Sequence, residues 1–203
     1  MSLELNALFG DARIMMILRG VGTPEAGVAA AERAWRLGVD LVEVPIGERA
    51  ELPILEAVVA AGRSRGKDVG AGTIVSTEHV RLAVRAGARY TVAPGLDPQV
   101  AAASQNAGLP HMPGAFTATE VQTARRAGCT WVKVFPAGVL GPAWFRAMRG
   151  PFPRMSFMAT GGVQPQDGRA YLDAGAAMVG FGVSALSPAH NGHVANLTRR
   201  TVK

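Results

Sequence analysis

The stretch Arg126-Ala127-Gly128-Cys129-Thr130-Trp131-Val132-Lys133-Val134-Phe135-Pro136 contains the unit from which this chain is built. Its first three residues, an arginine, an alanine and a glycine, are typical of the C-terminal end of a helix. The valines and aromatic residues that follow predict a short β-strand over 131–135, closed by Pro136. The stretch therefore predicts a helix followed, within a few residues, by a strand.

This helix–glycine–strand unit recurs along the chain, with its glycines roughly 20 to 28 residues apart. Helices are predicted to start at Thr23-Pro24, Ser76, Asp97-Pro98, Thr117 and Gln164-Pro165. Eight alternating βα units in 203 residues predict a compact (β/α)8 TIM barrel. Its strands are expected at residues 14–18, 41–44, 69–72, 90–93, 110–112, 131–135, 157–160 and 178–181.

We expect a single domain over residues 1–203, with an N-terminal helix or tag residues in 1–12 and a C-terminal helix or tail in 187–203. An open doubly wound sheet is the alternative fold. The sequence lacks the Gly-x-Gly-x-x-Gly fingerprint with a following acidic residue that would favour it.

Composition narrows the class of protein. Hydrophobic residues make up 48% of the chain, which is typical of a globular protein. Cys129 is the single cysteine, which excludes an intramolecular disulfide and indicates a reducing compartment. The sequence shows neither an apolar run near the ~20 residues of a membrane span nor a signal peptide, so we expect a cytoplasmic protein without membrane contact. A net charge of +6 suits an anionic partner, but the arginines are dispersed, so we expect no nucleic-acid binding.

Lys133 lies in the middle of a predicted apolar strand, where lysine is unusual because desolvating an ammonium group is costly. A desolvated lysine becomes a usable amine nucleophile, as Schiff-base chemistry requires. Glu43 shares its strand face with Leu41 and Pro45, so we expect it to face the barrel lumen and lie near Lys133. Such a pair can move protons; the alternatives are a structural ion pair and a lysine that snorkels to solvent.

Other polar residues and glycines follow the predicted strands, at the end of the barrel where TIM-barrel active sites lie. Arg19 is a candidate clamp for a carboxylate, and Thr73 a candidate hydrogen-bond donor beside Gly70 and Gly72, which would let a ligand approach the backbone. The alternatives are a rim arginine and a tight strand end. Candidate phosphate-binding glycines, alternatively ordinary turns, are Gly161, Gly162 and Gly182. The four histidines show no metal-ligand spacing, so we expect no metal.

Seven motifs in order resemble those of the KDPG/KHG aldolases, class I pyruvate aldolases that cleave 2-keto-3-deoxy-6-phosphogluconate (KDPG) and its relatives. The motifs are Ile17-Leu18-Arg19-Gly20, Val42-Glu43-Val44-Pro45, Gly70-Ala71-Gly72-Thr73, Ala93-Pro94-Gly95-Leu96, Met112-Pro113-Gly114, Lys133-Val134-Phe135-Pro136-Ala137 and Ala159-Thr160-Gly161-Gly162-Val163. They run from about Arg13 to Leu186 and so cover nearly the whole chain.

The resemblance implies a homotrimeric TIM barrel without metal or cofactor, acting in carbohydrate metabolism of the Entner–Doudoroff type. Lys133 would form the Schiff base and Glu43 would be the general acid/base. The substrate would be KDPG or its galactonate isomer, KDPGal, and the products pyruvate and glyceraldehyde 3-phosphate. The implied substrate-binding residues are Arg19 and Thr73 at the pyruvate carboxylate, Pro94, Phe135 and Thr160 elsewhere in the site, and Gly161, Gly162, Gly182 and Ser184 at the phosphate.

Two positions depart from the family pattern. Gly47 stands where many members carry an arginine, with Arg49 nearby. Val183 stands where a serine is expected, and Ser184 follows one place later, which would turn its hydroxyl to the other face of a strand. Two other functions stay open: a phosphate-binding epimerase or isomerase that does not need Lys133, and a non-catalytic arginine-rich protein that binds nucleic acid.

Overall fold

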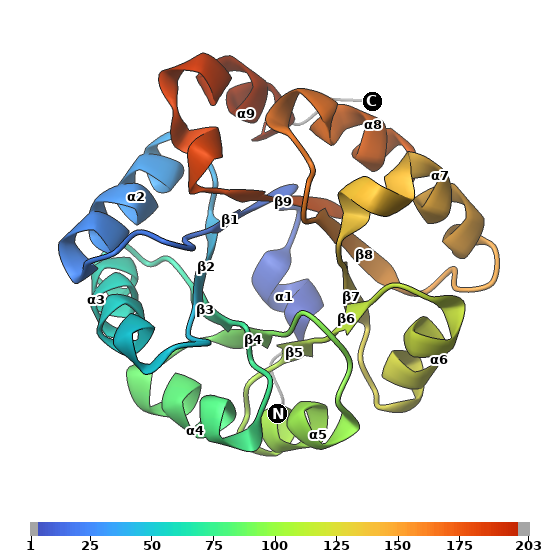
Figure 1. The fold of residues 1–203 in the computed structure, drawn as a ribbon, viewed down its shortest axis with the longest axis horizontal. Coiled ribbons are helices and arrows are strands. Elements are labelled where there is room, and N and C mark those ends of the chain that lie inside the picture. The colour runs from blue at the N-terminus through green and yellow to red at the C-terminus, as the bar shows by residue number, and fades with distance from the viewer. Residues whose placement is uncertain (1–3, 199–203) are drawn as a thin grey trace.

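The computed structural model describes residues 4–198, and their strands form one parallel sheet curved into a barrel with helices around it (Figure 1). Possible tag residues 1–3 and the end of the expected C-terminal tail, 199–203, lie outside the described residues. The strands run in the order β5-β4-β3-β2-β1-β9-β8-β7-β6. The predicted TIM barrel is confirmed.

The strands are short and buried, as their runs of valine, methionine and aromatic residues predict. They are β1 (Ile14–Ile17), β2 (Leu41–Pro45), β3 (Val69–Gly72), β4 (Tyr90–Val92), β5 (His111–Met112), β6 (Gly114–Ala115), β7 (Trp131–Val134), β8 (Ser156–Thr160) and β9 (Met178–Gly182). The helices are α1 (Leu5–Phe9), α2 (Pro24–Arg36), α3 (Leu52–Arg63), α4 (Thr77–Ala86), α5 (Pro98–Asn106), α6 (Ala118–Arg126), α7 (Ala137–Arg149), α8 (Gly168–Asp173) and α9 (Asn191–Thr198). Short 3-10 helices are η1 (Arg49–Glu51), η2 (Pro165–Asp167), η3 (Val183–Leu186) and η4 (Pro188–His190).

The fifth strand, predicted at 110–112, differs from the expectation, because two short strands meet at Pro113 and the second, β6, lies outside the predicted range. β5 pairs with β4, and β6 pairs with β7. Proline has no N–H to donate to a sheet, but the Pro113 carbonyl still accepts a 2.8 Å hydrogen bond from the Lys133 amide. Since β5 and β6 are the two ends of the sheet and one residue joins them, this break is also where the barrel closes.

Four of the predicted helix starts are confirmed by side-chain caps. Thr23, Ser76 and Asp97 each accept hydrogen bonds from backbone amides in the first turn, and Thr117 forms a capping box with Glu120. The fifth predicted start, at Gln164-Pro165, is wrong because the chain after Gln164 first forms the 3-10 helix η2, and α8 begins only at Gly168.

The core has two parts, one between the sheet and the outer helices and one inside the barrel. The lumen is filled by large side chains from the strands, namely Met15, Leu41, Tyr90, Val92, Met112, Trp131, Met158 and Met178. Helix α1 sits at the centre of the ring in Figure 1, and its Leu5 and Phe9 close this cluster. The Phe9 ring meets Tyr90 and Trp131 edge to face, at centroid distances of 5.1 Å each. In residues 4–198, no helix has both the length and the apolar character needed to cross a bilayer.

Candidate active site

The barrel lumen holds a buried lysine–carboxylate pair at its upper level. Lys133 comes from β7 and Glu43 from β2, and Lys133 Nζ lies 3.5 Å from Glu43 Oε1. The Lys133 side chain is 5% exposed and that of Glu43 is 0% exposed. Beyond this ion pair, neither carboxylate oxygen has a hydrogen-bond partner among residues 4–198. A buried carboxylate with unused acceptor capacity, held next to an amine, has the geometry that proton transfer requires.

Two glycines of β3 make room for this level of the lumen. A Cβ atom added to Gly72 would lie 2.0 Å from Glu43 Oε1, and one added to Gly70 would lie 2.0 Å from Cε2 of the Tyr90 ring. The space above both glycines is therefore occupied by side chains of the protein itself. The expectation that these glycines bring a ligand close to the backbone is wrong for this arrangement.

Arg19 and Thr73 lie together across the end of β2. Arg19 Nη2 donates a 2.9 Å hydrogen bond to Thr73 Oγ1. The two residues follow β1 and β3, which flank the strand of Glu43. Thr73 has a φ of 59°, a left-handed conformation that is strained for a β-branched residue. The Thr73 hydroxyl accepts a hydrogen bond from Arg19, which does not use the hydroxyl's own proton, so its expected role as a donor to ligand stays a prediction.

The expected phosphate-binding glycines follow the neighbouring strands β8 and β9. Gly161 and Gly162 have left-handed φ values of 82° and 78°. Gly161 is packed so closely on Phe135 that an added Cβ would lie 2.6 Å from the ring, and its carbonyl accepts from the Gly138 amide. Gly182 ends β9, and no atom of residues 4–198 lies within 4 Å of where its Cβ would be. Two strand ends thus present glycine backbone, and Gly182 faces open space.

The remaining expected site residues occupy distinct surroundings. Ser184 is exposed in η3, beyond the end of β9. Thr160 is 3% exposed, and its hydroxyl donates a 3.0 Å hydrogen bond to the Gly180 carbonyl. The Pro94 carbonyl lies where a side chain at Gly114 would be, so these two backbones are in close contact. The Phe135 ring is 40% exposed, with its centroid 5.7 Å from Lys133 Nζ. Its strand ends at Val134, one residue earlier than predicted.

Tyr90 is the lumen residue that the sequence did not point out. Its hydroxyl donates a 2.9 Å hydrogen bond to the carbonyl of Val42, the residue before Glu43. Burial, and next the charge of Glu43, raise the pKa of Tyr90 well above its ordinary value, so the phenol stays neutral. The available signal was that Tyr90 shares the lumen face of β4 with Val92, beside the glycine strand.

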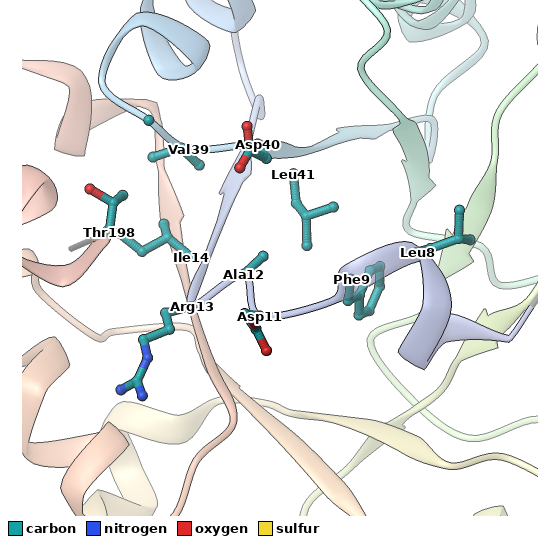
Figure 2. Close-up of a pocket in the computed structure, with 11 residues that line it drawn as sticks. Leu8, Phe9, Asp11, Ala12, Arg13, Ile14, Val39, Asp40, Leu41 and Thr198 are labelled. Carbon is teal, nitrogen blue, oxygen red and sulfur yellow. The ribbon is translucent and has the colours of Figure 1, made fainter. Parts of the chain in front are cut away.

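A separate pocket of about 290 Å³ lies away from this site (Figure 2). It is lined by the connection from α1 to β1, the start of β2 and Thr198. Asp40, one of its polar residues, forms an ion pair with Lys67. Because Ile14 and Leu41 are the first residues of β1 and β2, the pocket lies at the N-terminal ends of the strands and contains neither Lys133 nor Glu43.

A family model described as KDPG and KHG aldolase matches residues 6–199 of this chain. The chain belongs to the KDPG and KHG aldolase family. It is 32% identical over 170 residues to the 2-dehydro-3-deoxy-6-phosphogalactonate aldolase of Escherichia coli K12, covering 83% of this chain and 82% of that protein. It is 40% identical over 108 residues, 52% of this chain and 51% of that protein, to the 2-dehydro-3-deoxy-phosphogluconate aldolase of Treponema pallidum.

A solved structure described as native KDPGal matches with a TM-score of 0.79 and 31% identity, over 91% of this chain and 90% of that one. The Legionella pneumophila KDPG aldolase has the same fold, with a TM-score of 0.82 at 24% identity and coverage of 98% of both chains. The expected family is thereby confirmed. The protein is an aldolase, a carbon–carbon lyase of the 2-dehydro-3-deoxy-phosphogluconate and phosphogalactonate type.

Proposed function

We propose that this aldolase works through a Schiff base on Lys133 and reversibly cleaves a 2-keto-3-deoxy-6-phospho sugar acid, KDPG or KDPGal, to pyruvate and glyceraldehyde 3-phosphate. The observation that carries the proposal is the isolated buried pair, with Lys133 Nζ 3.5 Å from Glu43 Oε1. An amine needs a low-polarity site to act as a nucleophile, and a base must be within reach of the same substrate. The pair supplies both.

The steps follow from these two groups. The Lys133 amine adds to the C2 ketone to form a carbinolamine, which loses water to give a protonated imine. Glu43 then takes the proton of the C4 hydroxyl while the C3–C4 bond breaks. The electron pair of that bond moves into the imine and forms an enamine, and the aldehyde leaves. Protonation of the enamine at C3, followed by hydrolysis of the imine, releases pyruvate and restores the amine.

We assign the rest of the site by position. Arg19 and Thr73, which are hydrogen-bonded to each other, would bind the pyruvate carboxylate. Pro94, Phe135 and Thr160 would form the walls. The glycine backbone at Gly161, Gly162 and Gly182 would bind the phosphate, with the exposed Ser184 as the nearest hydroxyl after β9.

Gly47 leaves the family's arginine position empty. An added Cβ there would lie 3.0 Å from the Thr73 side chain, so a longer residue would reach toward the Arg19–Thr73 contact. We propose that Arg19, together with Thr73, binds the carboxylate in this chain without an arginine at position 47. We further propose that the protein is a homotrimer, which sedimentation equilibrium of the purified protein would test. We also propose that it acts in the cytoplasm.

The test of the mechanism is incubation with pyruvate and sodium borohydride, followed by intact mass and peptide mapping. We expect a single reduced adduct on Lys133, its loss in Lys133→Met, and its retention in the control Lys67→Met, which removes a lysine that is ion-paired on the surface. A folded wild-type protein without adduct would refute the Schiff base and favour a barrel that needs no lysine. Cleavage rates with KDPG and KDPGal then decide the substrate.

A further inference from the structure

Tyr90 joins the strand of Glu43 to the floor of the lumen. Its side chain is 0% exposed, and its hydroxyl donates to the Val42 carbonyl at 2.9 Å. That carbonyl belongs to the peptide linking Val42 to Glu43, so the hydrogen bond acts on the backbone that carries the carboxylate.

The side chains of Tyr90, from β4, and Glu43, from β2, both pack over the strand between them, β3. β3 lies between β2 and β4, and Glu43 is in register with Gly70. The Tyr90 ring covers Gly70, and the Glu43 carboxylate covers Gly72, each within 2.0 Å of the missing Cβ. The ring therefore fills the position on β3 next to the carboxylate, and Glu43 has no room to fold down toward Gly70. The effect of the Glu43 charge on the pKa of Tyr90 agrees with this proximity.

The ring is itself held from below. Phe9 meets it edge to face with an interplanar angle of 85°, and meets Trp131 in the same way at 84°. The Trp131 indole donates a 2.7 Å hydrogen bond to Asn6 Oδ1. Trp131 and Lys133 lie two residues apart on β7 and share a strand face, so this aromatic cluster includes a residue of the lysine's strand and, through the Tyr90 hydroxyl, contacts the strand of Glu43.

We propose that Tyr90 is a positioning residue for Glu43, one that fixes the Val42–Glu43 peptide through its hydroxyl and keeps the carboxylate over Gly72, within reach of Lys133. This role rests on the proposed function. It predicts that loss of the hydroxyl slows proton transfer without weakening pyruvate binding.

The assay is exchange of the methyl hydrogens of pyruvate with D2O, followed by proton NMR over a range of pyruvate concentrations. Exchange needs imine formation on Lys133 and removal of a C3 proton by a base, but no aldehyde. For Tyr90→Phe we expect the exchange rate at saturating pyruvate to be about three- to tenfold below that of wild type, which is the effect expected from the loss of one hydrogen bond. The half-saturating pyruvate concentration should change less than twofold, and borohydride trapping should persist.

Tyr171→Phe is the matched control. Tyr171 is the only other tyrosine of the chain, and its hydroxyl also points at a backbone carbonyl, that of Ala137, but from helix α8 outside the lumen. We expect its exchange rate to equal that of wild type. If Tyr90→Phe does not fold, Phe9→Leu loosens the ring while keeping the hydroxyl, and it should slow exchange more than twofold.

The outcomes separate the two proposals. A Tyr90→Phe protein that exchanges within twofold of wild type, or that loses trapping as well, overturns the positioning role. If that variant does not fold, a Phe9→Leu rate within twofold of wild type does the same. A wild-type protein that neither traps nor exchanges pyruvate refutes the proposed function, and the role of Tyr90 with it.

Discussion

Replacing Gly72 by alanine tests whether the position of Glu43 limits catalysis. The new Cβ would lie 2.0 Å from Glu43 Oε1, 2.6 Å from Cδ and 2.7 Å from Cγ, against an ordinary contact distance of 3.4 Å. The carboxylate must therefore move by more than 1 Å. Because the clash is with the far end of a flexible side chain, the side chain and not the backbone gives way, and we expect the fold to persist with a loss of about 1–3 kcal/mol.

The expected loss of activity follows from this displacement. A misplacement of about 1 Å in a reacting group costs on the order of 100-fold in rate. We expect pyruvate proton exchange by Gly72→Ala to fall by about that factor. Borohydride trapping on Lys133 should remain, because the three atoms nearest to the added methyl group all belong to Glu43.

Gly192→Ala provides the control, since it makes the same chemical change in α9, where no atom in the described part of the chain lies within 4 Å of the new Cβ. Circular dichroism and melting curves would show whether both variants are folded. If Gly72→Ala exchanges pyruvate within threefold of wild type, the carboxylate either need not be where the structure has it or is not the base. Either result refutes the reasoning from geometry.

Three further variants address the rest of the chain. Thr73→Gly should raise the free energy of unfolding by about 1 kcal/mol, because glycine adopts the φ of 59° without strain. The same variant should need a higher pyruvate concentration for half-saturation, because Arg19 loses its hydrogen-bond partner. An unchanged half-saturating concentration would contradict the carboxylate assignment. Gly182→Ala should leave the melting temperature unchanged, since the new Cβ enters open space. It should raise KM for a phosphorylated substrate but not for pyruvate. An unchanged KM for the phosphorylated substrate would show that Gly182 is not part of the phosphate site. Burial lowers the pKa of His111 from 6.5 to about 4 in the folded protein. Below pH 6.5 the unfolded chain therefore binds more protons than the folded protein does. The free energy of unfolding should consequently fall by about 3 kcal/mol from pH 6.5 to pH 4. In urea unfolding at pH 7 and pH 4.5, His111→Asn should flatten this fall, and an unchanged pH dependence would show that His111 is not its source.

Much of the fold could be predicted because local signals agree with it. Threonine, serine and aspartate caps mark the helix starts, and alternation along β2 and β7 places Glu43 and Lys133 in one lumen. The division of the fifth strand at Pro113 was not predicted, since a three-residue apolar run does not show which neighbour each residue pairs with.

The fine structure of the site was less accessible for a similar reason. Gly70 and Gly72 indicate empty space, but only the fold shows that Tyr90 and Glu43 fill it. The Thr160 hydroxyl is engaged by Gly180 on the adjacent strand, a partner 20 residues away in sequence. Side-chain pairing across strands depends on register, which a single sequence fixes poorly when strands are buried on both faces.

The central position of α1 has a consequence for how the chain assembles. Helix α1 is made before any strand, yet Asn6 bonds to Trp131, 125 residues later. A five-residue helix is too short to be stable alone, so these residues must wait, unpacked, until β4 and β7 exist. Long-range contacts of this kind close late because of the chain entropy they cost. On the ribosome, the floor beneath the catalytic pair is therefore among the last parts of the barrel to form, although helix α1 is synthesised before the described strands.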